Sequence, residues 1–295
     1  MILDTESKNN KAKSGLYIVS TPIGNLSDVT LRAIETLKNS DYILCEDTRV
    51  SKNLLNRYEI KSKLISNHKF NEKKNLLRII EILKSGHIVS LISDAGTPLI
   101  SDPGFKLVRL VREANISVIP IPGVSAITAA LCVAGLATDR FCFEGFLASK
   151  QGAREQSLSQ LKYELRTMVF YESPHRIEAM LASVVSVFGE NRQVFVGREL
   201  TKKFESHFLG SGADVLAWLQ ADPNNQRGEF VVIVAGCDKD AQQSQKQEVG
   251  LKLALQLVSE MSLKKAVALA SDVTGARKNL LYAAMIEIKN SSGDA

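Results

Sequence analysis

Short runs of apolar, often β-branched residues alternate with longer amphipathic stretches, and this alternation constrains the fold more than any other feature of the chain. The first 123 residues contain five such runs, at 16–21, 42–46, 63–66, 87–93 and 116–121. The stretches between them place apolar residues three or four apart, as at Leu31, Ile34 and Leu37, which is the period of a helix. Strands that alternate with helices predict a parallel sheet with helices packed on its faces.

A second series of elements begins after the Pro120–Ala126 segment. Its predicted strands are 140–146, 167–173, 192–200, 203–210 and 229–236. The last three have few helical residues between them, which indicates a mixed, partly antiparallel sheet. We therefore expect an N-terminal α/β domain at 15–123 and a C-terminal α/β domain at 124–237.

The two ends of the chain differ from these domains. Residues 1–14 are polar and predict a disordered tail, whereas residues 238–249 are rich in glutamine without an apolar period, which predicts a linker. Residues 250–290 predict a small helical domain whose last two helices have the proportions of a helix-turn-helix. Two roles stay open for it: packing on the preceding domains or on a second subunit, and contact with nucleic acid.

Composition narrows the class of protein. No apolar run approaches the ~20 residues that a helix needs to span a bilayer, and residues 1–14 lack the apolar stretch of a signal peptide. We therefore expect a cytoplasmic protein without membrane contact. The four cysteines form no CxxC or CxxH pair, so no metal or redox site is expected. The net charge of +5 favours an acidic partner only weakly.

The loops at the carboxyl ends of the predicted strands have unusual residues, and open α/β sheets bind their ligands there. After the fourth strand, residues 93–104 hold two Ser-Asp pairs, two glycines and two prolines. Asp94 and Asp102 offer hydrogen-bond acceptors, and prolines stiffen the loop, which lowers the ordering entropy of binding. After the first strand, Pro22 and Gly24 predict a tight turn whose backbone amides can hold a polar ligand group.

Charged clusters follow other strands. The second strand ends in Glu46, Asp47 and Arg49. The FYESPHR segment at 170–176 brings an aromatic, an acidic and basic residues together, and GRELTKKFE at 197–205 is charged as well. For the last segment, a solvated surface stays an equal alternative to a binding site.

Six motifs occur in an order and spacing that resemble one family. They are LYIVSTPIGNLSDVTLRAIETL, CEDTR, SDAGTPLISDPG, PGVSA, FYESPHR and GRELTKKFE. From about Leu16 to Cys237 the chain resembles the cytidine 2′-O-methyltransferases of small-subunit ribosomal RNA, in the tetrapyrrole methylase (class III methyltransferase) superfamily. Porphyrinoid-modifying relatives carry a more glycine-rich first loop that typically ends in Gly-Asp-Pro, so STPIGN in this chain fits the RNA branch.

The resemblance implies two α/β domains with S-adenosylmethionine in a cleft between them, a small C-terminal helical domain and a homodimer. It implies a decoding-centre cytidine of 16S rRNA, in the assembled small ribosomal subunit, as the methyl acceptor. The cofactor-binding residues implied by the motifs, with Tyr171 near the adenosine, are Pro22, Ile23, Gly24, Asp94, Ala95, Gly96, Thr97, Ile100, Ser101, Asp102, Ser125, Ala126 and Tyr171. Basic residues expected to hold rRNA phosphates are Arg49, Lys150, Arg154, Arg198, Lys202 and Lys203.

Methyl transfer from a sulfonium is an in-line displacement, in which positioning alone can supply ~7–11 kcal/mol. The ribose oxygen must also lose its proton, to a carboxylate or to a neutral lysine, or a cation must stabilise the alkoxide. The candidates are Glu46, Asp47, Glu172, Glu199 and Lys202. We expect the base in CEDTR or FYESPHR, which puts Glu46, Asp47 and Glu172 first.

Three other functions remain open. The first is C-methylation of a porphyrinoid, the second is nucleic-acid binding without catalysis, and the third is methylation of a protein.

Overall fold

The computed structural model describes residues 13–68 and 72–291. The described chain divides into two compact units, residues up to 133 with 197–207, and residues 134–196 with those from 208 onward. Most of the predicted disordered tail, residues 1–12, lies outside the described residues.

The first unit contains a five-stranded sheet in the order β3-β2-β4-β1-β5. Every strand pairs in parallel with its neighbours, so the predicted parallel sheet is confirmed. The strands are β1 (Gly15–Val19), β2 (Tyr42–Cys45), β3 (Lys63–Ser66), β4 (Ile88–Leu91) and β5 (Val118–Ile121). Their carboxyl ends all lie at one edge of the sheet, which brings the loops after β4, β1 and β5 next to one another.

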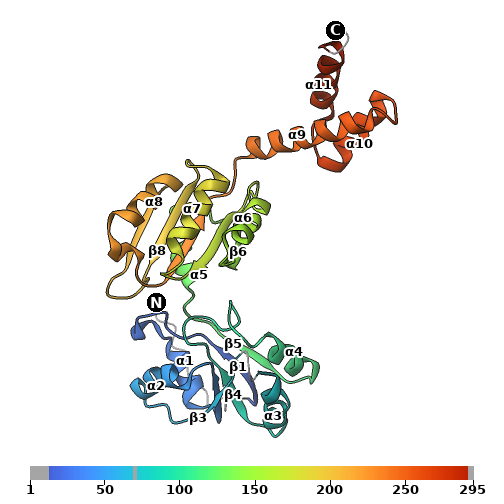
Figure 1. Cartoon of the computed structure of the whole chain (residues 1–295). Coiled ribbons are helices and arrows are strands. Elements are labelled where there is room, and N and C mark those ends of the chain that lie inside the picture. The colour runs from blue at the N-terminus through green and yellow to red at the C-terminus, as the bar shows by residue number, and fades with distance from the viewer. Residues whose placement is uncertain (1–12, 69–71, 292–295) are drawn as a thin grey trace, which may run out of the picture. The chain divides into compact units, whose positions relative to one another are not determined.

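Helices cover both faces of this sheet (Figure 1). Helices α1 (Leu31–Lys38) and α2 (Thr48–Arg57) contribute to one hydrophobic cluster with the strands. Helices α3 (Glu72–Lys84) and α4 (Phe105–Glu113) contribute to the cluster on the other face. Burial on both faces explains why the strands read as near-continuous apolar runs.

The apolar stripe expected on α1 is only partly correct. Leu37 is buried, but Leu31 is 86% exposed, and Ala33 lies in the core instead. Thr30 caps the helix by accepting a hydrogen bond from the Ala33 backbone, so Leu31 is the first helical residue. Ala33 and Leu37, four residues apart, set the buried face.

The second unit contains a sheet in the order β6-β7-β10-β8-β9. Strand β6 pairs in parallel with β7, whereas β10 pairs antiparallel to β7, so the predicted mixed sheet is confirmed. Its strands are β6 (Phe141–Phe146), β7 (Thr167–Glu172), β8 (Gln193–Arg198), β9 (Ser206–Ser211) and β10 (Phe230–Val234).

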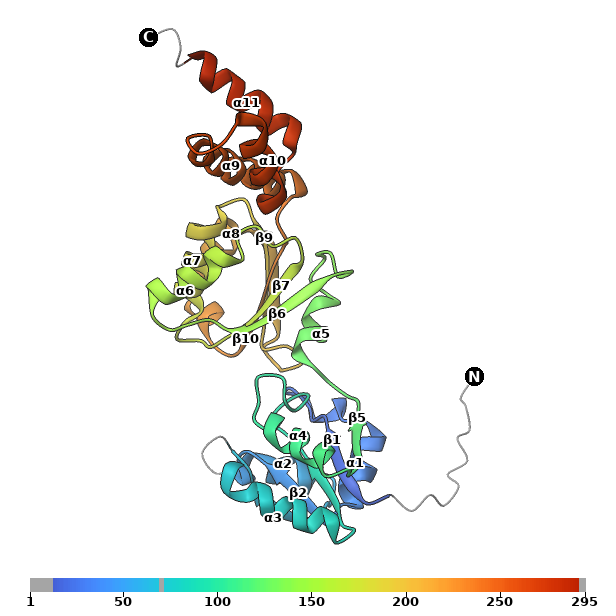
Figure 2. The same cartoon turned by 90° about the vertical axis from the view of Figure 1, so that its right-hand side faces the viewer.

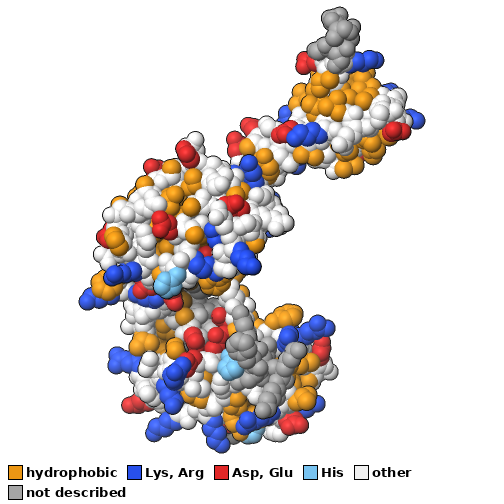
Figure 3. Space-filling model, viewed as in Figure 1, with side chains coloured by type: hydrophobic (Ala, Val, Ile, Leu, Met, Phe, Trp, Pro, Cys, Tyr) orange, Lys and Arg blue, Asp and Glu red, His pale blue; other side chains and the backbone are white. Residues whose placement is uncertain are grey.

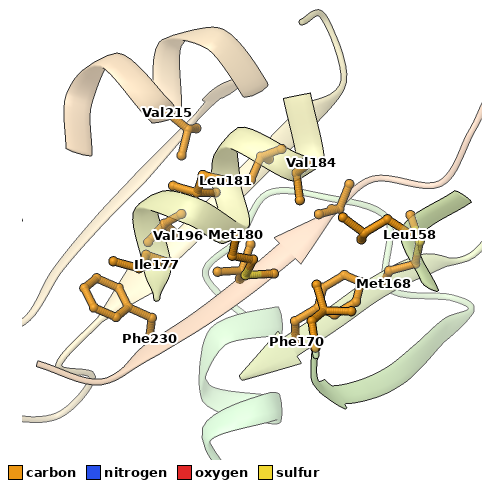
Figure 4. Packing of buried hydrophobic residues seen from close by; sticks show 14 of the residues in the cluster. Leu158, Met168, Phe170, Ile177, Met180, Leu181, Val184, Val196, Val215 and Phe230 are labelled. Carbon is orange, nitrogen blue, oxygen red and sulfur yellow. The ribbon is translucent and has the colours of Figure 1, made fainter. Parts of the chain in front are cut away.

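Three helices, α6 (Gln151–Gln160), α7 (Ile177–Phe188) and α8 (Gly212–Ala221), lie on one side of this second sheet (Figure 2). Side chains of α7 such as Met180 and Val184 pack against Met168 and Phe170 of β7 in the main core of this unit (Figure 4). This core fixes the carboxyl ends of β6 and β7, where the predicted FYESPHR segment begins.

The boundary between the units lies near residue 133, not near 123 as the sequence suggested. Helix α5 (Ala126–Leu131) groups with the first unit. The physical reason is that the Pro122–Val124 turn is fixed to that unit: a Cβ on Gly123 would lie 2.8 Å from Ser20 Cβ. This turn therefore belongs to a packed loop cluster and is no free hinge.

The predicted linker at 238–249 is helical: Asp238 is the N-cap and residues 239–249 form the first half of α9 (Lys239–Leu257). Asp238 caps this helix by accepting from the Asp240 backbone at 2.9 Å. Glutamine, lysine and alanine are good helix formers. The apolar period is missing because only Gly250 and Ala254 of α9 are buried.

Helices α9, α10 (Leu263–Thr274) and α11 (Lys278–Ser291) share a small core of their own. The expected turn between the last two helices is present: Gly275 adopts a left-handed conformation (φ +70°) and donates to Ser271 O at 2.9 Å. Hydrophobic side chains remain on the outside of these helices (Figure 3), including Val273 and Leu280. Within the described residues, no helix combines the length and apolar character that crossing a membrane requires.

The cysteine environments predict one reactive thiol per native chain. Burial raises the pKa of Cys45 and Cys237, and burial together with Glu144 raises the pKa of Cys142 to about 11, which suppresses the reactive thiolate. Cys132 is exposed. With a chromogenic disulfide reagent at pH 8, we expect one fast thiol, absent in Cys132→Ser, and the remaining thiols only after denaturation. Two equally fast thiols in the native protein would contradict this assignment.

Candidate active site

Loops that follow three neighbouring strands of the first sheet are joined by hydrogen bonds. We call residues 20–24, 93–104 and 122–126 the three-loop cluster. Thr21 and Gly96 exchange backbone hydrogen bonds of 2.9 and 3.0 Å, and Thr21 Oγ1 donates to Ser93 O at 3.2 Å. The loops after β1 and β4 therefore form one unit, although their residues are more than 70 positions apart.

The third loop joins through Thr97. Its Oγ1 donates to Val124 O at 2.9 Å and lies 3.0 Å from Ser20 Oγ, so the Ser20 hydroxyl donates to Thr97. Ser20 and Thr21 are buried. A buried hydroxyl that loses its partner is costly, so these bonds hold the three-loop cluster in one arrangement before any ligand binds.

Gly96 packs closely against Ile23 in the loop after β1. Its φ is +80°, and a Cβ there would lie 3.3 Å from Ile23 Cγ2. Leu99 and Ser101 also have positive φ values, of 75° and 70°, which non-glycine residues adopt at an energetic cost and mostly at functional sites. The backbone of the loop after β4 is thus held in unfavourable conformations by its contacts with neighbouring residues.

The surface of the three-loop cluster combines acidic, polar and apolar groups. Asp94, Ala95, Ile100 and Ser101 are exposed. Carboxylates suit an ammonium, and small or apolar side chains such as those of Ala95 and Ile100 suit a flat ring. The residues present therefore fit an amino-acid nucleoside such as S-adenosylmethionine. Of the other predicted cofactor residues in this unit, Pro22, Ile23 and Gly96 are buried, Gly24 is exposed, and Thr97, Asp102, Ser125 and Ala126 are half-buried.

The acidic loop after β2 lies beside the loop after β4, because Asp47 N donates to Asp94 Oδ1 at 3.2 Å. Asp47 caps α2 and forms a two-point ion pair with Arg49, at 3.1 and 2.7 Å. The Arg49 hydrogen bonds hold the pKa of Asp47 near 2, well below its usual value. A carboxylate with so low a pKa is a weak base, which leaves Glu46 as the better candidate in this loop.

Asn67 is a polar residue that the sequence reasoning missed. It follows β3 directly and donates its backbone N–H to Cys45 O at 2.8 Å. Its side chain is buried, and neither Nδ2 nor Oδ1 has a hydrogen-bond partner among the described residues. Its position after a strand at the sheet edge was the only signal available.

Glu172 and Tyr171 lie in the second unit, at the end of β7. The Glu172 side chain is fully buried, accepts from Ser173 N at 2.8 Å and pairs with Arg176 at 3.1 Å. Tyr171 packs edge-on against Phe143, with ring centroids 4.9 Å apart. Glu172 is therefore engaged in holding the chain, which disfavours it as the catalytic base.

The predicted phosphate-binding residues differ in availability. Arg49, Lys150 and Lys203 are exposed, whereas Arg154 is only 5% exposed and its guanidinium donates to Ser183 Oγ and Ser149 O. Arg154 thus holds α6 on α7, and we withdraw it as a phosphate contact.

The remaining two basic residues lie near the β8–β9 turn. Arg198 donates to Phe204 O at 2.8 Å, and Lys202 pairs with Glu199 at 2.8 Å. Both side chains therefore have partners within the protein. No group of three or more potential metal-ligating side chains occurs within residues 13–68 and 72–291.

Comparison with known proteins defines the class first. Residues 15–216 match the tetrapyrrole (corrin/porphyrin) methylase family model, and residues 247–289 match the model of the RsmI C-terminal HTH domain. A solved uroporphyrin-III C-methyltransferase from Thermus thermophilus, in complex with S-adenosylhomocysteine, shares the fold with a TM-score of 0.53. It is 19% identical and covers 75% of this chain and 97% of its own. The two sheets and their helices are thus those of a tetrapyrrole methylase.

Curated relatives then define the particular family. The ribosomal RNA small subunit methyltransferase I of Haemophilus influenzae is 46% identical over 90% of this chain and 94% of its own length. The protein of the same name from Pasteurella multocida is 47% identical, over 90% and 95%. The chain belongs to the ribosomal RNA small subunit methyltransferase I family, as its motifs predicted.

Proposed function

We propose that this protein transfers a methyl group from S-adenosylmethionine to the ribose 2′-hydroxyl of a decoding-centre cytidine in 16S rRNA, within the assembled small ribosomal subunit. The observation that carries the proposal is the 46–47% identity, over nine-tenths of the chain, to methyltransferases named for the ribosomal RNA of the small subunit. The organised three-loop cluster, at the sheet edge where open α/β folds bind ligands, supports it.

In this proposal the three-loop cluster holds the cofactor. Gly96 would keep the loop after β4 packed on Ile23, the exposed Ile100 would contribute apolar surface for the nucleoside, and the exposed Asp94 carboxylate would suit the ammonium. Thr21, Ser93 and Thr97 keep the loops in place through their hydroxyl groups. When bound, S-adenosylmethionine supplies an electrophilic methyl group on a sulfonium.

Glu46 is our proposed general base. It follows β2 directly, beside the Asp47–Asp94 contact that joins two of the loops. Asp47 is engaged with Arg49 and Glu172 with Arg176. As the ribose oxygen attacks the methyl carbon, Glu46 accepts the proton of the ribose hydroxyl. The resulting carboxylic acid of Glu46 then returns that proton to solvent.

The test uses labelled S-adenosylmethionine with intact small subunits and, separately, with protein-free 16S rRNA. We expect transfer to intact subunits and one new position of resistance to alkaline cleavage, because a 2′-O-methyl group removes the nucleophile for that cleavage. Label in the RNA without any resistant position would mean methylation of a base and would contradict the 2′-hydroxyl assignment.

The alternatives predict different results. A porphyrinoid C-methyltransferase would shift the Soret band of an added porphyrinoid and would leave ribosomal RNA unlabelled. A binding protein without catalysis would bind small ribosomal subunits but transfer no label, and it would lose this binding when the residues after Asp238 are removed.

We also propose a cytoplasmic homodimer. Light scattering, which separates 32.3 kDa from twice that mass, tests the dimer.

Lys150→Gln is expected to weaken binding to small subunits without changing the affinity for S-adenosylmethionine. Lys150 is exposed at the start of α6, and a lost phosphate contact lowers the slope of log affinity against log salt by about one. Exposed Lys162 provides the matched control, as Lys162→Gln. A fall in cofactor affinity for Lys150→Gln would contradict this role.

A further inference from the structure

A bulge in β6 brings three aromatic rings onto one face of the second sheet. The register runs from Phe143↔Val169 to Gly145↔Phe170 and Phe146↔Tyr171, so Glu144 is the extra residue. Side chains alternate along a strand, and without the bulge two residues three positions apart would face opposite sides. With it, Phe143 and Phe146 both lie on the face of Tyr171. Gly145, with φ +68°, permits this geometry.

The rings form a surface that is open at one end. Tyr171 lies 4.9 Å from Phe143 and 5.7 Å from Phe146, measured between ring centroids. Phe143 and Tyr171 are half-buried, whereas Phe146 is 55% exposed. Phe143 thus supports Tyr171 from within. Phe146 and Tyr171, whose ring planes are tilted by 59° to each other, form an aromatic platform at the carboxyl ends of two parallel strands.

The buried ion pair of Glu172 holds this platform in position. Arg176 donates to Leu147 O, the residue directly after Phe146, and to Glu172 Oε2 at 3.2 Å. The end of β6 is thereby tied to the end of β7. The fully buried Glu172 carboxylate therefore positions the aromatic platform through Arg176. This role involves no proton transfer.

We propose that the aromatic platform binds an unpaired base of the RNA substrate, with the base stacked on the exposed ring of Phe146 and Tyr171 packed against its edge. Single-stranded RNA bases are recognised in this way, by stacking on phenylalanine and tyrosine. The exposed Lys150, four residues after Phe146 on the same connection, is placed to meet the adjoining phosphate. This inference rests on the proposed function, because it takes the substrate to be RNA.

The base bound at the platform could instead be the adenine of the cofactor, since the resemblance places Tyr171 near the cofactor's adenosine. The exposure of Phe146 and the adjacent Lys150 favour the RNA. An adenine on the platform would make cofactor affinity, rather than subunit affinity, depend on the two rings, so the two sources are separable by experiment.

The experiment compares the wild-type chain with Phe146→Leu, Tyr171→Leu and Phe146→Tyr. Phe141→Leu is the matched control, because Phe141 is 44% exposed at the opposite end of the same strand. Subunit affinity is measured by co-sedimentation, cofactor affinity by calorimetry, and folding by thermal unfolding. We expect about a tenfold loss of subunit affinity for each leucine variant, recovery in Phe146→Tyr, and no change in Phe141→Leu.

Unchanged subunit affinity in both leucine variants would overturn the inference, as would a loss confined to cofactor affinity. Methyl transfer by the wild type is scored separately. If the wild type binds small ribosomal subunits without methyl transfer, the proposed function is contradicted but the base-binding inference can still be tested. If the wild type transfers methyl groups and the substitutions at Phe146 and Tyr171 change neither rates nor affinities, only the base-binding inference is contradicted. A wild type that neither binds nor methylates subunits would remove both.

Discussion

Glu46→Gln is expected to slow methyl transfer to small subunits by about 10²–10⁴-fold in a single turnover, the usual contribution of a general base. Glutamine keeps the shape of the side chain but cannot accept the proton of the ribose hydroxyl. Cofactor affinity is expected to stay near that of the wild type, because the three-loop cluster is held by Thr21, Ser93 and Thr97.

Asp47→Asn and Glu172→Gln are the comparison variants for Glu46→Gln. The Arg49 ion pair keeps the pKa of Asp47 near 2, so this carboxylate is ionised throughout the pH range of the assay but is weakly basic. We expect Asp47→Asn to affect helix α2 more than the rate, and Glu172→Gln to lower subunit affinity through the aromatic platform. A normal rate for Glu46→Gln beside a large loss in either comparison variant would move the base to that residue.

Local patterns predicted the elements well where a strand is short and bounded by polar residues. The KLIS run coincides with β3, Lys63–Ser66, a half-buried strand at the edge of the sheet whose neighbouring residues in the chain are polar. The order of loops and strands also placed Asp94 and Gly96 at the sheet edge. The hydrogen bond between Ser20 and Thr97 could not be predicted, since it joins residues 77 positions apart and depends on the positions of their side chains.

Another error arose where a charged residue is buried by tertiary packing. Arg154 appears in a polar segment, yet it shares a helix face with Leu158 and its guanidinium finds Ser183 on α7. Phe143 and Phe146 are three positions apart in the sequence, and in a regular strand residues at this spacing face opposite sides of the sheet. Only the bulge at Glu144 unites them, and nothing but the observed register reveals it.

Gly236→Ala is expected to destabilise the second unit by about 3 kcal/mol or more, at the upper end of the usual cost of overpacking. A Cβ on Gly236 would overlap the carbonyl oxygen of Leu165, which is backbone and cannot rotate away. The residue cannot withdraw either. On one side, Ala235 N donates to Gln193 O at 2.9 Å, and on the other, Cys237 N donates to Glu164 O at 2.6 Å.

The single tryptophan provides the measurement for Gly236→Ala. Trp218 lies in the second unit, stacked on Phe208 with ring centroids 5.4 Å apart, so its fluorescence during urea unfolding reports this unit. Gly152→Ala is the matched control, because no atom lies within 4 Å of a Cβ there and alanine favours a helix over glycine by up to ~1 kcal/mol. We expect the urea midpoint to fall for Gly236→Ala and to hold or rise for Gly152→Ala. Equal midpoints for Gly236→Ala and the wild type would show that the strand end can move apart from the 164–166 segment, against the packing described above.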